Sequence, residues 1–269
     1  MTITGSWKWK PAPVTKAELK YRPAFSIWGG SIGLTLVMLL CQVHLLQAGP
    51  GSDSIRTVLN VNPRVHSSGF FPFSGAILPA SPVADLNIFM EKRRWGFFLF
   101  QSLDLNNPHA VVNYLQPGLF AVFRPSPKLK IRTHFGYIFN QTQGFKDNDS
   151  DYFSGLQVNW NLRPGLRIEN STLYFDWNIR SKMAHRFLVE YSKPRWRVSG
   201  YVWYRKVFAD SDGALSAAAA ITWPIIPISS KSNLELTTTV MGYVSDYVPS
   251  FARRDGIFFT VAVPIDVMR

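Results

Sequence analysis

The sequence predicts an all-β fold, an up-and-down antiparallel transmembrane β-barrel of about 12 strands, preceded by an N-terminal signal or anchor segment. Three observations support this prediction. Stretches of alternating apolar and polar residues recur at intervals of about 15 to 20 residues up to the C-terminus. The connections between them are alternately short and long. Aromatic residues make up 14% of the chain and include nine tryptophans, which suits the interfacial girdles of a membrane barrel.

The clearest strand is the stretch 128–140, with the sequence KLKIRTHFGYIFN. Ile131 and Phe135 fall on one face of an extended chain, because successive side chains point to opposite sides. Lys130, Arg132 and His134 fall on the other face. We therefore expect an apolar face toward lipid and a polar face toward the lumen.

Eleven further stretches are predicted as strands from the same alternation. They lie at 55–62, 83–91, 95–103, 111–124, 152–162, 166–177, 183–192, 196–207, 215–223, 234–244 and 257–265. The stretch 63–82 holds four prolines and is predicted as a long loop, because proline interrupts strand pairing. The alternation slips near Asn170, which predicts a β-bulge there.

The connections have the length pattern of an outer-membrane barrel. Short turns such as Lys92-Arg93-Arg94 and Arg163-Pro164-Gly165 alternate with longer polar segments such as residues 141–150. Short turns face the periplasm in such barrels and longer loops face outward. An even strand number then places both ends of the 12-strand chain on the periplasmic side. The connection 224–232 is longer than this pattern predicts.

The chain divides into residues 1–48, a basic region with a signal peptide or anchor helix, and residues 49–269, the barrel. Five Lys or Arg residues precede the long apolar run at 32–46, and Ala48 offers a small residue for cleavage. A basic region, an apolar core and a small residue are typical of a secretory signal. The alternative is an uncleaved anchor, since residues 24–48 are long enough to span a bilayer.

Composition excludes several other classes of protein. The net charge is +12, but the charges are mostly isolated, and no recognition helix or glycine-rich phosphate loop is visible, so nucleic acid is not an expected partner. The single cysteine, Cys41, allows no internal disulfide and no cysteine-based metal site. We expect no metal and no cofactor.

In its general pattern, the stretch 55–267 resembles bacterial outer-membrane β-barrel proteins of the porin-like type, without a motif of one particular family. The resemblance implies export to the outer membrane of a Gram-negative envelope. It also implies contact with membrane lipid, lipopolysaccharide and the barrel-assembly machinery, and an envelope protein is a further candidate partner.

The polar face of the predicted strands, opposite the apolar face, defines the candidate lumen-lining residues. They are Lys130, Arg132, His134, Arg167, Arg186, Arg197, Arg205, Asp85, Glu91, Glu169, Glu190 and Glu235. A barrel of about 12 strands is intermediate between filled 8-strand barrels and open porins, so a narrow channel is expected. Two interpretations of these charges remain open: a lining that favours anions, or a lattice of ion pairs that fills the interior.

Three functions follow, in order of preference. The first is a narrow pore for small hydrophilic solutes, anionic ones included, and the second is a non-transporting structural or assembly subunit of an envelope complex. The third is a lipid-modifying enzyme, for which Ser154 and His185 share the apolar face. These two residues lie on strands that the stretch 166–177 separates, too far apart for a hydrogen-bonded pair, and no nucleophile motif is present.

Overall fold

The computed structural model describes residues 57–68, 70–71, 76–77, 82–106, 113–140, 151–175, 182–207, 213–229, 232–248 and 253–268. The predicted signal or anchor segment at 1–48 and the predicted loop at 141–150 lie outside these residues. Within the described ranges, no helix is long and apolar enough to cross a bilayer.

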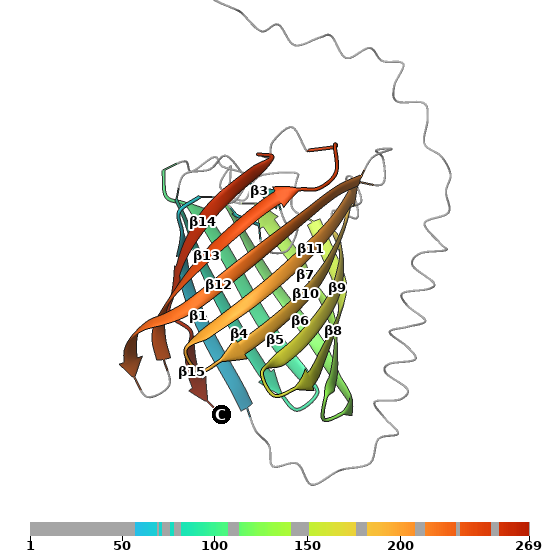
Figure 1. Cartoon of the computed structure of the whole chain (residues 1–269). Helices are drawn as coiled ribbons and strands as arrows, with labels where there is room; N and C mark the ends of the chain where they lie inside the picture. Colours follow the sequence, from blue (N-terminus) through green and yellow to red (C-terminus); the bar gives the residue numbers. More distant parts are fainter. Residues whose placement is uncertain are drawn as a thin grey trace, which may run out of the picture. The chain divides into compact units, whose positions relative to one another are not determined.

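The described residues form a closed antiparallel barrel (Figure 1). The strands are β1 (Thr57–His66), β4 (Val83–Lys92), β5 (Trp95–Asp104), β6 (Tyr114–Ser126), β7 (Leu129–Asn140), β8 (Asp151–Arg163), β9 (Leu166–Phe175), β10 (Lys182–Lys193), β11 (Trp196–Val207), β12 (Gly213–Ser229), β13 (Ser232–Tyr243), β14 (Asp255–Ala262) and β15 (Ile265–Met268). A two-stranded hairpin, β2 (Phe70–Phe71) and β3 (Ala76–Ile77), lies between β1 and β4 in sequence.

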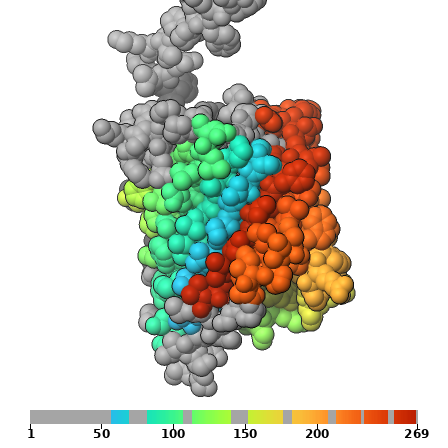
Figure 2. Space-filling view, turned by 90° about the vertical axis from the view of Figure 1, so that its left-hand side faces the viewer, coloured from blue at the N-terminus to red at the C-terminus, as the bar shows by residue number. Residues whose placement is uncertain are grey.

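The wall closes where β1 meets the end of the chain. From β4 to β14 each strand pairs with its neighbour in sequence, and β1 pairs with both β4 and β14. β15 continues along β1 beyond the end of β14, so the wall has 12 strands and one short addition. Figure 2 shows this seam, with blue β1 running diagonally beside the red C-terminal strands. The predicted 12-strand up-and-down barrel is confirmed.

The two faces of the wall differ in exposure as the alternation predicts. On β6, Leu119 is 62% exposed while its neighbour Phe120 is 1% exposed. Large apolar side chains such as Phe135, Leu156 and Val240 cover the outer face. This arrangement is typical of a membrane barrel, because the outer face contacts the hydrocarbon of the lipid and therefore carries apolar side chains.

Exposed tryptophan and tyrosine side chains lie toward both ends of the outer face. Trp95 and Trp160 are exposed beside the short turns, whereas Tyr152 and Tyr174 are exposed toward the opposite end. On β8, Tyr152 and Trp160 are separated by about 27 Å of extended chain. Because the strands are inclined to the barrel axis (Figure 1), this length fits an apolar band of about 25 Å or slightly less.

Tight turns join the strands at one end of the barrel. Four two-residue turns connect paired strand ends, at 93–94, 127–128, 164–165 and 194–195. Arg93 and Gly165 adopt positive φ angles of 56° and 79°. A left-handed residue suits the tight turn of a hairpin, and glycine adopts this backbone conformation without steric penalty.

Prolines caused the main errors in the predicted strand ends. β1 continues through Pro63 to His66, inside the predicted loop 63–82, which also holds β2 and β3. Pro63 lies at the gap where the partner of β1 changes from β14 to β15, so its missing N–H removes no ladder bond. Similarly, residues 257–265 are two strands, divided at Val263 and Pro264.

The prediction of a connection at 224–232 is also wrong. β12 runs through Pro224 and Pro227 to Ser229, which pairs with Ser232 at the start of β13. The register shifts between Pro224 and Ile226 and again between Pro227 and Ser229, because a bulge accommodates a residue that cannot donate to the ladder. This connection is therefore as short as the other turns at its end of the barrel.

The predicted bulge at Asn170 does not form. β9 pairs with β8 and with β10 in continuous register through Asn170, and the β8–β9 shift lies at the turn, between Asn161 and Arg163. The alternation slipped because Asn170 and Thr172 share the outer parity with Ile168. The polarity of the outer face changes there, but the backbone geometry does not.

Candidate functional site in the barrel interior

Ion pairs between strands that are not neighbours identify the inner face of the wall. Arg132 on β7 contacts Glu91 on β4, although β5 and β6 lie between these strands. Side chains can meet across two intervening strands only on the concave face of a curved sheet. Both residues therefore point into the barrel, together with residues of the same parity on their strands.

Glu91 is the centre of the largest ion-pair cluster. Its carboxylate accepts hydrogen bonds from Arg132 at 2.9 Å, from Lys130 at 3.4 Å and from Arg124. The Glu91 side chain is only 6% exposed, so its charge depends on these partners rather than on bulk water. The Arg132 guanidinium also lies over the rings of Phe89 and Phe120, at 4.8 and 5.6 Å.

A second set of pairs continues around the inner wall toward β13. Glu190 contacts Arg167 at 3.4 Å and Arg197 at 3.7 Å, and Arg197 donates to Glu235 at 3.1 Å. Arg186 pairs with the buried Glu169 on the adjacent β9. In these contacts and those of Glu91, six basic side chains meet four carboxylates.

Asp85 belongs to a separate cluster at the barrel seam. Its Oδ2 accepts a hydrogen bond from Arg64 at 2.9 Å and lies 2.8 Å from His66 Nε2. The other ring nitrogen of His66 lies 2.8 Å from the hydroxyl of Thr260 on β14. The chain of contacts thus joins β4, β1 and β14 across the closure of the wall. The sequence prediction missed Arg64 and His66 because it ended this strand at residue 62.

Two predicted residues lie apart from these ion pairs. Arg205 stands opposite Ala184 and Ala214, away from the tight turns. His134 packs between aromatic rings, with its ring centre 5.7 Å from those of Phe98 and Phe120. The interior therefore combines paired charges with an aromatic cluster, which the sequence did not predict because the stretch 95–103 is apolar on nearly both faces.

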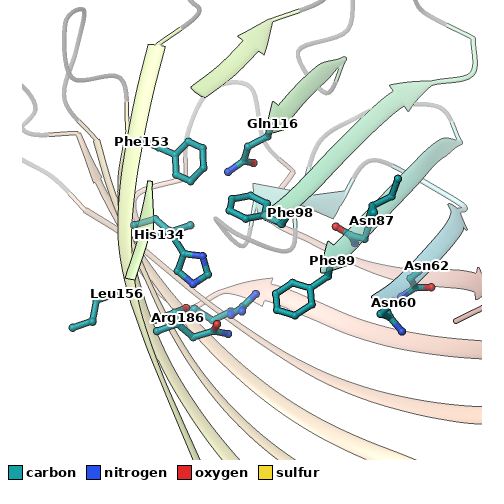
Figure 3. Close-up of a pocket in the computed structure, with 14 residues that line it drawn as sticks. Asn60, Asn62, Asn87, Phe89, Phe98, Gln116, His134, Phe153, Leu156 and Arg186 are labelled. Carbon is teal, nitrogen blue, oxygen red and sulfur yellow. The ribbon is translucent and has the colours of Figure 1, made fainter. Parts of the chain in front are cut away.

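A cavity of about 290 Å³ lies in the interior beside His134 (Figure 3). Its lining includes Asn60, Asn62, Asn87 and Gln116, together with the rings of Phe89, Phe98 and Phe153. Buried polar atoms of this lining without a protein partner include Asn62 Oδ1 and Arg186 Nε. A buried polar atom needs a hydrogen-bond partner, so these positions suit water or a polar solute.

The residues considered for an enzyme do not form a catalytic pair. Ser154 lies on β8 opposite Tyr174, whereas His185 lies on β10 opposite Thr172. The His185 ring contacts the hydroxyl of Thr172 at 2.8 Å and the amide of Asn170 at 3.4 Å. Across the described ranges, no three His, Cys, Asp or Glu side chains come together as a metal site.

Comparison with known proteins identifies the fold but no family. No family model matches the chain, and no curated protein matches it. Among solved structures, the KdgM porin superposes with a TM-score of 0.51 over 76% of this chain and 97% of its own, at 9% sequence identity. The NanC porin superposes with a TM-score of 0.52 over 76% of this chain and 98% of its own, also at 9% identity. The chain therefore has the fold of a porin-like outer-membrane β-barrel, as the predicted resemblance stated.

Proposed function

We propose that this protein is an outer-membrane channel through which small hydrophilic solutes diffuse. The observation that carries the proposal is the cavity of about 290 Å³, lined by amides and aromatic rings, inside a closed wall of 12 strands. A barrel that served only as a structural element could fill its interior with apolar side chains. Here, beside buried apolar side chains such as Phe100 and Trp203, the interior contains paired charges, amides and buried polar atoms that need water.

The outer surface supports the membrane location in this proposal. Apolar side chains cover the outer face, and exposed tryptophan and tyrosine side chains lie toward both ends. The basic residues Lys92, Arg93, Lys128, Arg163, Lys193 and Arg195 are exposed at the tight turns. We place this end in the periplasm, because outer-membrane barrels have their short turns there.

The ion-paired charges of the inner wall support only a weak preference for anions. Six basic groups against four carboxylates leave two positive charges in excess. Paired charges contribute little to selectivity, because each is neutralised locally before a permeating ion meets it. We therefore propose a channel for small solutes with modest anion selectivity, in which the residues of the predicted lumen set line the path.

Planar-bilayer recordings of the purified full chain test this function. We expect steady single-channel steps and a reversal potential in a KCl gradient that indicates modest anion preference. Arg132→Glu and Arg197→Glu should each move the reversal potential toward cation selectivity, because each reverses a charge on the inner wall. Lys128→Glu, at an exposed turn, is the control and should have a smaller effect. A correctly folded barrel that stays silent would contradict the channel and favour the structural or assembly subunit.

A further inference from the structure

The lining of the interior cavity combines amides and aromatic rings (Figure 3). Asn60 and Asn62 on β1 and Asn87 on β4 form an amide-rich wall. Phe98 on the adjacent β5 and Phe153 on β8 contribute aromatic rings, with centres 5.8 Å apart, and Phe89 on β4 adds a third ring. A ligand that fits here needs one face that packs on aromatic rings and an edge that hydrogen-bonds to amides.

The cavity offers no uncompensated charge to an ionic ligand. Arg186 is the charged residue in its lining, and it is paired with Glu169. Arg132 is held by Glu91 and by two aromatic rings. An anion that entered would lose its hydration without gaining a free cation, which disfavours anion binding at this position.

Amide side chains match hydroxyl groups in particular. Each Asn or Gln amide provides both donors and an acceptor, and each hydroxyl both donates and accepts. Asn62 Oδ1 is buried and has no protein partner, so it is available to accept from a ligand. The volume of about 290 Å³ is equivalent to about ten molecules of liquid water and holds one small ring.

We infer that this cavity is a binding site for one uncharged, hydroxyl-rich ring, of the size and class of a monosaccharide. The C–H face of the ring packs on Phe98 and Phe153, and its hydroxyl groups bond to Asn62, Asn87 and Gln116. The inference rests on the proposed channel, since it assigns a solute class to the path inside the barrel. It differs from a simple anion pore, because the site discriminates against charged solutes.

The test uses glucose and its anionic counterpart glucuronate on the full chain in planar bilayers. Millimolar glucose should reduce the single-channel current, and glucuronate should do so at least tenfold less well. Asn62→Leu keeps the approximate side-chain volume but removes the amide, and Phe98→Leu removes the ring. Each should weaken the glucose effect about tenfold, since a lost hydrogen bond or ring contact in a buried site has an effect of this order. Asn233→Leu, at an exposed position outside the cavity, should leave it unchanged.

Failure of this inference can be distinguished from failure of the channel. Steady conductance that glucose and glucuronate affect equally would overturn the binding site and leave the channel intact. A silent barrel would overturn the channel, and equilibrium dialysis of labelled glucose against the detergent-solubilised chain then decides the site. Binding of glucose that Asn62→Leu weakens would support the site, and absence of binding would overturn it.

Discussion

Replacing Glu91 with glutamine should destabilise the barrel by about 3–5 kcal/mol, the range for breaking a buried ion pair. The substitution preserves the shape of the side chain but removes the charge that Arg124, Lys130 and Arg132 share. Arg132 then lies against Phe89 and Phe120 without its counterion. The free energy of unfolding can be measured by urea titration in lipid vesicles, with tryptophan fluorescence as the signal.

The same substitution should increase anion selectivity. Removal of one of the four carboxylates in the Glu91 cluster and the second set of pairs raises the excess of positive charge on the path. The reversal potential in a KCl gradient should move further toward the value for chloride. Asp246→Asn is a matched control, because Asp246 is exposed outside the strands. Unchanged stability together with unchanged selectivity in Glu91→Gln would contradict the role of Glu91 as the centre of the cluster.

Replacing Asp85 with asparagine should open the barrel seam and lower the free energy of unfolding by about 3–5 kcal/mol. The Asp85 side chain is 1% exposed and accepts from Arg64, and it also contacts His66, whose side chain is 3% exposed. Asparagine removes the charge and turns one acceptor atom into a donor that faces these partners. The His66 ring, which contacts Thr260 through one nitrogen, then loses the carboxylate that faces its other nitrogen.

Amide hydrogen exchange locates the effect of Asp85→Asn. Exchange should accelerate most in β1 and β14, around Val65 and Val261, which pair at the seam. Asp255→Asn on β14 removes an exposed carboxylate from a strand of the same seam and should have little effect. Uniform acceleration over the whole barrel, without enrichment at the seam, would argue against a local clamp.

The fold could be predicted from the sequence because a membrane barrel follows one rule on every strand. Lipid requires an apolar outer face and paired backbone groups, so alternation alone locates most of the strands. The rule failed at Pro63 and Pro224, where proline was interpreted as a strand end, and at Pro264, through which the predicted strand 257–265 continued. In the structure these prolines lie at a change of partner, at a bulge and at a strand break, positions that depend on the neighbouring strand.

The site could be predicted only in part. Parity along β4 and β7 placed Glu91 and Arg132 on the same face, but not against each other. Their contact depends on the curvature of the wall and on the register of four strands, and neither is encoded in a single strand. The seam cluster was missed for a related reason, since His66 meets Thr260 only after the barrel closes. Contacts between distant strands are therefore the part that required the structure.

Thiol accessibility during current recording tests the central claim, that ions pass through the interior beside the cavity. Asn87→Cys places a thiol on the inner face of β4, and Leu86→Cys places one on the outer face, both in a Cys41→Ser background. A water-soluble, charged methanethiosulfonate reagent should react with the thiol at 87 and change the single-channel current within minutes. The thiol at 86 should stay unreactive, because it faces lipid. No reaction at 87, or a reaction that leaves the current unchanged, would contradict an aqueous path through the barrel.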